Sequence, residues 1–334
     1  MSGLKTYHLR ITLRTETRVV LGEHKGAALR GALINALRRH YCTAPLLSAG
    51  DPARQAHTAE CPVCRLVAAE DLSRTRGSDI PRPYVLEPPL HSQTTYMRGD
   101  LLIFRLGLFG DAADLYPFLL TAVLQMGHEG LGRPIHEGRR GTLSVRRIEA
   151  VNPLTREQVM LMGEADQPVT AEPTLPVTHE LVQRESARWP ADRITVRFLT
   201  PTRITANGRL AHSAQFQPFF QRLLERIIDL WRAYAGSDPP LDARTLIEHA
   251  AHIRLVADET RWVELESTSG RTGRRIPIGG YMGNATYSGE LRPLIPWLLW
   301  GTCLHVGKNA VKGDGWFEML PQDEGGQAWP LLST

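Results

Sequence analysis

The chain has 334 residues, of which 42% are hydrophobic and 22% are charged. This length suits two domains, and the composition is that of a globular protein, so it excludes a disordered, collagenous or coiled-coil chain. The formal charge is +4, and only four of the 39 basic residues are lysine, which leaves 35 arginines. Arginine suits a polyanionic partner such as nucleic acid, although a GC-rich genome would enrich arginine as well.

The apolar stretches of the sequence bear on where the protein acts. Residues 1–10 show no apolar segment followed by a small-residue cleavage site, so we expect no secretory signal. The longest nearly uncharged apolar stretch, residues 293–304, is shorter than the roughly 18 residues of a membrane span, and two prolines interrupt it. We therefore expect a cytoplasmic protein with no membrane partner, whose four cysteines are reduced.

Hydrophobic periodicity predicts the elements of the first half in chain order. Polar and apolar residues alternate near the N-terminus, as in a strand with one buried face, and the spacing of Leu29, Leu33 and Leu37 predicts a helix. The long stretch after this helix shows no sustained period, and we interpret it as an irregular insertion. The predicted order is a strand at 7–13, a helix at 26–41, the insertion at 43–89, a strand at 101–109, a helix at 114–127, a glycine-rich loop at 130–141 and a strand at 142–151.

The second half repeats this plan after a proline-rich linker at residues 153–190. The predicted order is a strand at 193–199, an amphipathic helix at 215–234, strands at 253–266 and 275–287, a helix at 290–304, a Gly-rich loop at 305–316 and a strand at 316–319. Each half thus has the order β-α-β-β-α-β. We predict an α+β fold of two tandem ferredoxin-like, or RRM-like, domains at residues 1–152 and 191–334.

Six stretches of sequence carry a resemblance to a known family. They are Lys25–Ala32 (KGAALRGA), Ile80–Pro89 (IPRPYVLEPP), Glu129–Arg133 (EGLGR), Leu199–Ile204 (LTPTRI), Ile278–Gly283 (IGGYMG) and His305–Glu318 (HVGKNAVKGDGWFE). With the predicted element order, they make the chain similar to the CRISPR precursor-RNA processing endoribonucleases, the sixth of the core Cas proteins, in the RAMP superfamily. Each stretch alone is a weak signal, but the combination spans nearly the whole chain and is specific.

The resemblance implies a metal-independent endoribonuclease that needs no cofactor for catalysis. Such an enzyme cuts the repeats of a CRISPR transcript by attack of a ribose 2′-hydroxyl, leaving a 2′,3′-cyclic phosphate and a 5′-hydroxyl. The reaction needs a base, an acid and fixed positive charge near the phosphate. The implied partners are CRISPR repeat RNA, the guide RNA and other Cas proteins of an antiviral interference complex.

Three histidines are candidates for proton transfer, since histidine changes its charge near neutral pH. His305 matches the family's histidine beside the terminal loop, and related enzymes often place their catalytic histidine on or just after the first helix, where His40 lies. His24 precedes the same helix, and Lys308 would add a cation to the catalytic site. Each histidine has a purely structural alternative, such as bonding to the last carbonyls of a helix.

Glycines and cations are the predicted RNA contacts. The glycines of the terminal loop would let a phosphate approach the backbone closely, although Asp314 and Trp316 depart from the family's pattern there. The predicted RNA-binding set is Lys25, Arg30, Arg133, Arg139, Arg140, Arg274, Arg275, Gly307, Lys308, Lys312, Gly313 and Gly315. Contacts of this kind give an affinity that falls with salt. A simple turn and a solvated surface are the alternatives.

The cysteines indicate one metal site. Cys61 and Cys64 have the spacing of half a zinc site, and Cys42 and His57 could complete four ligands. Such a zinc would be structural and would fasten the insertion. Free thiols are the alternative, because a single CxxC is a weak signal.

Two other functions stay open at this stage. The first is a non-catalytic RAMP subunit that binds guide RNA and relies on another nuclease. The second is a general RNA-binding protein outside CRISPR systems. The complete duplicated fold, together with His40, His305 and Lys308, favours the enzyme.

Overall fold

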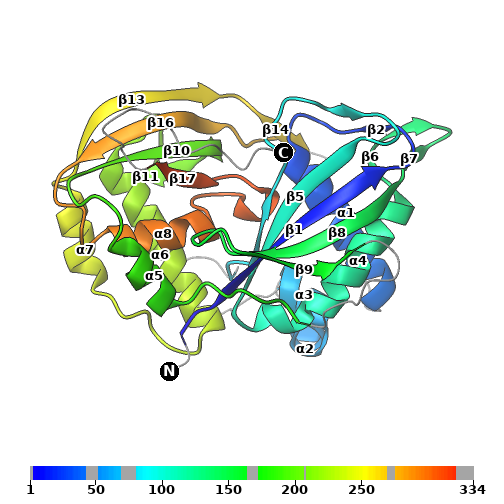
Figure 1. Cartoon of the computed structure of the whole chain (residues 1–334), viewed down its shortest axis with the longest axis horizontal. Helices are drawn as coiled ribbons and strands as arrows, with labels where there is room; N and C mark the ends of the chain where they lie inside the picture. Colours follow the sequence, from blue (N-terminus) through cyan, green and yellow to red (C-terminus); the bar gives the residue numbers. More distant parts are fainter. Residues whose placement is uncertain are drawn as a thin grey trace.

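Two antiparallel sheets with helices packed against them make up the computed structural model of the chain (Figure 1). The structure describes residues 3–42, 52–68, 80–163, 172–206, 208–268 and 275–320. Within these ranges, no helix is long and apolar enough to cross a membrane. Each sheet belongs to one βαββαβ arrangement, and we call these the first unit and the second unit.

The first unit has a five-stranded sheet in the order β3-β5-β1-β8-β9. Its elements are β1 (Thr6–Thr15), α1 (Lys25–Tyr41), β3 (Tyr84–Glu87), β5 (Leu101–Phe109), α4 (Tyr116–Glu129), β8 (Leu143–Val151) and β9 (Gln158–Met162). β1 lies between β5 and β8 and is antiparallel to both. The first and third strands of the βαββαβ order therefore lie side by side at the centre of the sheet.

The second unit has a four-stranded sheet in the order β13-β16-β10-β17. Its elements are β10 (Arg193–Thr202), α6 (Phe216–Tyr234), β13 (Arg254–Val263), β16 (Gly280–Ser288), α8 (Ile295–Leu304) and β17 (Phe317–Leu320). The relative order of its four strands is the same as in the first unit. The prediction of two tandem ferredoxin-like folds is confirmed.

Shorter elements extend both units. β2 (Val19–Val20) pairs with β4 (Thr95–Tyr96), and β6 (Leu131–His136) forms a hairpin with β7 (Arg139–Gly141). The others are α2 (Pro52–Glu60), α3 (Pro62–Ala68), the 3-10 helix η1 (Gly110–Leu115), α5 (His179–Ser186), β11 (Ile204–Ala206), β12 (Arg209–Ala211), α7 (Ala243–Ala250), β14 (Glu266–Thr268), β15 (Arg275–Pro277) and the 3-10 helix η2 (Ala310–Lys312).

The alternation along β1 explains which face of the first sheet is covered. Leu9, Ile11 and Leu13 are buried in the apolar core that α1 and α4 complete. His8 and Arg10 have the opposite parity and lie on the other face of the strand. The apolar stripe of α6 is buried against the second sheet in the same manner.

The expectation of an irregular insertion at residues 43–89 is wrong for the part that the structure describes. α2 and α3 fold there, and β3 forms an edge of the first sheet. The two helices have only 9 and 7 residues, so neither is long enough to show a sustained period in sequence. Val63 and Leu66 of α3 are buried in the first core, and this tertiary contact supports helices that would be marginal alone.

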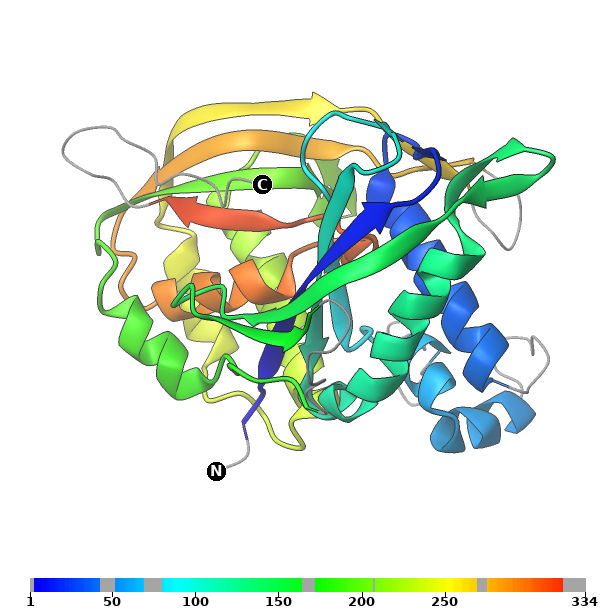
Figure 2. The same ribbon diagram turned by 45° about the vertical axis from the view of Figure 1, so that its right-hand side comes forward.

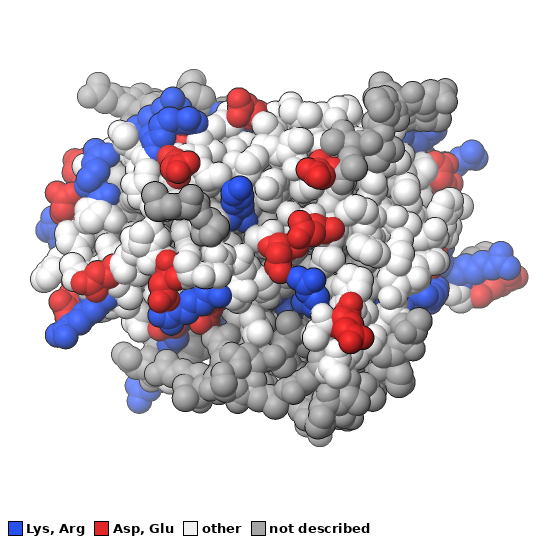
Figure 3. Space-filling model, turned by 90° about the horizontal axis from the view of Figure 1, so that it is seen from below, with Lys and Arg blue, Asp and Glu red and all other residues white. Residues whose placement is uncertain are grey.

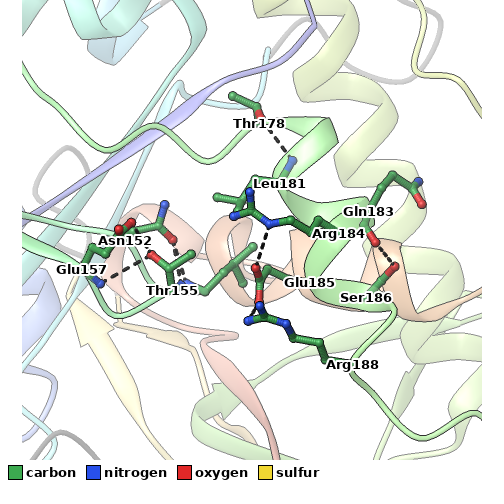
Figure 4. Close-up of polar contacts among 11 residues, drawn as sticks. Asn152, Thr155, Glu157, Thr178, Leu181, Gln183, Arg184, Glu185, Ser186 and Arg188 are labelled. Atoms are coloured by element: carbon green, nitrogen blue, oxygen red, sulfur yellow. Dashed lines mark hydrogen bonds and ion pairs between the residues drawn. The ribbon is translucent and has the colours of Figure 1, made fainter.

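Two other segments are more regular than predicted. Residues 130–141, expected as a loop, form the β6–β7 hairpin. The expected linker at 153–190 contributes β9 to the first sheet and also contains α5. Thr178 caps α5 by accepting a hydrogen bond from the Leu181 N–H at 3.2 Å, and the buried Glu185 carboxylate pairs with two arginines near the end of the helix (Figure 4). Local capping and pairing thus order a segment that its prolines mark as irregular.

The two units meet where the C-terminal glycine loop packs against the first unit. A Cβ at Gly26 would overlap the backbone oxygen of Lys312, and a Cβ at Gly313 would lie 2.5 Å from Cδ of Pro88. In addition, Val85 and Phe109 of the first unit are buried in the core of the second. The units are therefore joined by direct packing as well as by the chain between them.

Candidate functional site

His40 lies on the last turn of α1 and is the most exposed of the three candidate histidines, with 36% of its side chain accessible. Its Nε2 lies 3.1 Å from Oε1 of Glu129, the last residue of α4. The other carboxylate oxygen of Glu129 pairs with Nη1 of Arg39 at 3.0 Å. When the neutral imidazole donates its Nε2–H to Glu129, Nδ1 is left as the nitrogen that can accept a proton.

A cavity of about 370 Å³ lies next to this pair, between α1, the end of α4 and the β6–β7 hairpin. Its lining includes Arg39, His128, Glu129, Arg139 and Arg140. Both hairpin arginines are exposed. Guanidinium groups suit the geometry of phosphate, so the cavity can hold a phosphate beside Glu129, the partner of His40.

His24 occupies the opposite end of α1. Its Nε2 lies 2.6 Å from Oδ1 of Asp314, and both side chains are largely buried. Burial raises the pKa of Asp314, although the neighbouring His24 acts in the opposite direction. At 1.5 Å per helical residue, His24 and His40 are about 24 Å apart along α1. The two histidines therefore cannot act on one phosphate.

His305 is enclosed by protein, and its catalytic role stays a prediction. Its side chain is 0% exposed, and its ring stacks on Trp316 with centroids 6.1 Å apart. Its Nε2 lies 3.8 Å from Oε1 of Glu87, too long for a hydrogen bond. Burial lowers the pKa of His305. An RNA strand could not reach this ring without opening the contact between the units.

Glu87 is the centre of a buried polar cluster that was not predicted. Its Oε2 accepts a hydrogen bond from Nη1 of Arg105 at 3.1 Å, and His8 Nδ1 lies 3.9 Å from Oε1, the oxygen that His305 also approaches. Burial would raise the pKa of Glu87, but His305, Arg105 and His8 outweigh it and lower the pKa to about 2. A glutamate that ends a strand of three buried apolar residues, Tyr84 to Leu86, was the signal that could have identified it.

The glycine loop at residues 305–316 was predicted to cradle a phosphate with its amide groups. The N–H groups of Gly313 and Gly315 instead donate to the carbonyls of Ala310 and Pro201. Both glycines have positive φ, 91° and 69°, which lets the loop turn tightly against its neighbours. These two amides are therefore already bonded within the protein, and the glycines serve close packing; the phosphate contact of the loop stays a prediction. Gly307 also serves close packing, because a Cβ there would lie 2.6 Å from a backbone oxygen of the β10–β11 connection.

The lysines near this loop differ in their access to solvent. Lys308 is exposed. Lys312 is half-buried, and burial together with the nearby Arg30 lowers its pKa. Lys25 is 5% exposed, and its ammonium group donates to backbone carbonyls within residues 89–91. The charge of Lys25 is thus already used inside the fold, and its contact with RNA stays a prediction.

The remaining predicted cations lie on separate surfaces. Three of them, Arg133, Arg139 and Arg140, are exposed on the hairpin. Arg30 donates to the Tyr84 hydroxyl at 3.1 Å, and Arg275 is exposed and pairs with Glu266 at 3.3 Å. Arg274 lies outside the described residues. On the face seen from below, the described cationic and acidic side chains are interspersed (Figure 3). The hairpin is thus where predicted cations gather beside a candidate histidine.

The predicted metal ligands Cys42, His57, Cys61 and Cys64 do come together. Their four ligand atoms all lie within 4.8 Å of one another. Cys42 directly follows α1, and the other three lie on or between α2 and α3. The end of α1 therefore carries a Cys/His cluster fit to hold a metal ion, two residues from His40.

Family models and solved structures agree with the duplicated fold. A model described as an N-terminal domain matches residues 4–174, and the model of the CRISPR-associated endoribonuclease Cas6 matches residues 196–317. Two tandem ferredoxin-like units, with a glycine loop before the last strand, define the class of fold. Residues 196–317 therefore belong to the Cas6 family, and the solved Cas6 structures share the fold of the whole chain. No curated protein sequence matches it.

Solved Cas6 structures share the fold at low sequence identity. A Cas6 product complex aligns with a TM-score of 0.56 and 17% identity over 96% of this chain and 100% of the other. Thermus thermophilus Cas6 aligns with a TM-score of 0.53 and 16% identity over 96% and 100% of the two chains. A chain of a partial Cas6-RT-Cas1–Cas2 complex aligns with a TM-score of 0.61 and 12% identity, over 99% of this chain and 48% of that one.

Proposed function

We propose that this protein cuts CRISPR repeat RNA in the precursor transcript to give guide RNAs, with His40 as the residue that moves the proton. One observation carries this assignment. An exposed imidazole is held at 3.1 Å by Glu129, and Glu129 lines a cavity together with Arg39, Arg139 and Arg140. Neither of the other candidate histidines combines exposure, an orienting carboxylate and a group of arginines.

The geometry supports attack by the ribose 2′-hydroxyl next to the scissile phosphate. Nδ1 of His40 takes the hydroxyl proton, and the oxygen then forms a bond to phosphorus while the bond to the 5′-oxygen breaks and that oxygen takes a proton from water. The arginines stabilise the charge that develops on the phosphorane. The products are a 2′,3′-cyclic phosphate and a 5′-hydroxyl. No metal takes part in these steps, and a metal at the Cys/His cluster would be structural.

The remaining cations have a binding role in this proposal. Arg133 on the hairpin and Lys308 on the glycine loop are exposed and contact the RNA backbone away from the cut. Arg275, which is also exposed, is assigned to the same role. The reaction takes place in the cytoplasm, and the partners are the repeat RNA, the retained guide RNA and other Cas proteins. A chain in a Cas6-RT-Cas1–Cas2 complex has the same fold as this one over part of its length, which supports association with other Cas proteins.

Cleavage of the cognate repeat RNA without added divalent metal, with analysis of the product ends, tests the function. We expect wild-type protein to leave a cyclic phosphate, and H40A to cut roughly 100- to 10,000-fold more slowly while binding RNA normally. E129A should also slow cleavage, because the imidazole loses its orienting partner. H252A is the matched control, since His252 is exposed on the second unit. If H40A cuts within tenfold of wild type, His40 is not the proton-transferring residue, and H24A and H305A become the next variants to test.

A non-catalytic RAMP subunit is the second candidate function. The burial of His305 and the internal use of the Gly313 and Gly315 amides favour it, because these predicted catalytic features are closed to RNA. Tight RNA binding without cleavage by intact wild-type protein would select this function over the enzyme.

A further inference from the structure

Two ligand-to-ligand distances in the Cys/His cluster match those of a filled tetrahedral site, and all four ligand atoms lie within 4.8 Å of one another. Zinc bonds to sulfur at about 2.3 Å and to imidazole nitrogen at about 2.0 Å, so a tetrahedral ion needs about 3.8 Å between two sulfurs and about 3.5 Å between sulfur and nitrogen. Sγ of Cys42 lies 3.8 Å from Sγ of Cys64 and 3.4 Å from Nε2 of His57. The first distance is also far beyond a disulfide bond.

The cluster joins three separate elements. Cys42 is the C-cap of α1, and its N–H bonds to the carbonyl of Arg38. His57 lies on α2, Cys61 lies between the two short helices, and Cys64 lies on α3. Figure 2 shows α2 and α3 beside the far end of α1. One ion bound here would therefore link the end of α1 to both short helices.

The surroundings favour a soft, tetrahedral cation. Cys61 and Cys64 are 7% and 9% exposed, so water has little access to their sulfurs. Three thiolates and an imidazole suit zinc and do not suit calcium or magnesium, which prefer oxygen. Three thiolates around a divalent ion leave one net negative charge, and Arg38 and Arg39 lie in the adjoining last turn of α1.

We infer that Cys42, His57, Cys61 and Cys64 bind one Zn²⁺, which fastens α2 and α3 to the end of α1 and so holds His40 against Glu129. The first part concerns the fold alone, and the second rests on the proposed role of His40. The ion takes no part in the chemistry. Cleavage in this protein thus needs no metal at the phosphate but needs a metal in the fold.

Metal analysis of protein purified without chelators tests the site. We expect about one zinc per chain in wild type, and loss of most of it in C61S and C64S. C303A should keep the zinc, because Cys303 is buried in α8, outside the cluster. A C61H variant, which restores a ligand, should regain it. Reduced wild-type protein with under a tenth of a zinc per chain, and no tetrahedral cobalt absorption after Co²⁺ addition, would overturn the site. Iron in place of zinc would overturn the choice of metal.

Single-turnover cleavage and RNA affinity, measured on the same variants, test the positioning. We expect C61S to cut at least tenfold more slowly while its RNA affinity changes less than threefold, and C61H to recover the rate. General unfolding would lower both quantities. If zinc-free C61S cuts as fast as wild type, the ion does not position His40. H40A serves as the cross-check: zinc-loaded but inactive H40A supports both proposals, whereas active H40A overturns the role of His40 and leaves the zinc site standing.

Discussion

Replacement of Glu87 by glutamine should destabilise the protein, because E87Q keeps the shape of the side chain and removes its charge. The pKa of Glu87 is about 2, against an ordinary value of 4.5. A difference of this size corresponds to roughly 3 kcal/mol of stability at neutral pH. Arg105 would also lose its carboxylate partner at a largely buried position. We expect the free energy of unfolding to fall by about 2–4 kcal/mol near pH 7.

The same cluster determines how stability depends on pH. Because the pKa of Glu87 is lower in the folded state, the unfolded chain takes up the proton first, and the stabilisation is lost as pH falls from about 4.5 to about 2. Burial lowers the pKa of His8 from 6.5 to about 4, so His8 also favours folding above 6.5 and loses its contribution between 6.5 and 4. E87Q should keep the loss due to His8 and lack the loss due to Glu87.

Urea denaturation followed by tryptophan fluorescence, at neutral and at acidic pH, measures both effects. Trp316 is a suitable probe, since it stacks on His305 within the cluster. E248Q is the matched control, because Glu248 pairs with Arg244 at an exposed site and such pairs contribute about 0–1 kcal/mol. An unfolding free energy of E87Q within about 0.5 kcal/mol of wild type near pH 7, with an unchanged pH dependence, would refute the reasoning.

Three further variants address the RNA surface, the loop and the core. R139A/R140A should bind repeat RNA more weakly, and the steepness of log affinity against log salt should fall by about 0.7–0.9 per lost phosphate contact. R244A on the second unit is the control. An unchanged slope would show that the hairpin does not contact the RNA. G315A should lower the unfolding free energy by more than about 1 kcal/mol, because its Cβ would overlap the Val306 carbonyl. G208A has a similar φ of 74° but open space around it, so in thermal unfolding it should lose less, and equal losses would contradict the role of packing. F219A should cost about 3–5 kcal/mol in urea, since Phe219 is fully buried, and a loss below 1 kcal/mol would contradict its place in the core.

Elements with one buried face could be predicted closely from local sequence. The strand predicted at 7–13 is β1 at Thr6–Thr15, and the helix predicted at 215–234 is α6 at Phe216–Tyr234. In both, the residues that face the core repeat with the period of the element. α2 and α3 are too short for such a period, and their position depends on packing against α1, so the insertion could not be predicted in the same way.

The site residues also differ in how far local sequence could predict their position. The Cys/His cluster was predictable because its ligands are chemically distinctive and close in sequence, from Cys42 to Cys64. His305 is buried beside Glu87, which belongs to the other unit. No local sequence pattern could predict this contact between the two units. Glu129 was overlooked because an acid at a helix end is common. Only its place beside His40, 89 residues away in sequence, gives it a role.

The packing between the units has a consequence for the order of events during synthesis. Val85 and Phe109 emerge from the ribosome with the first unit but are buried only by residues of the second core, and Gly313 closes the contact near the end of the chain. At roughly 5–20 residues per second, about 10–30 s pass between completion of β8 and arrival of this loop. During that interval, the first unit exposes apolar surface that residues of the second unit cover in the folded protein.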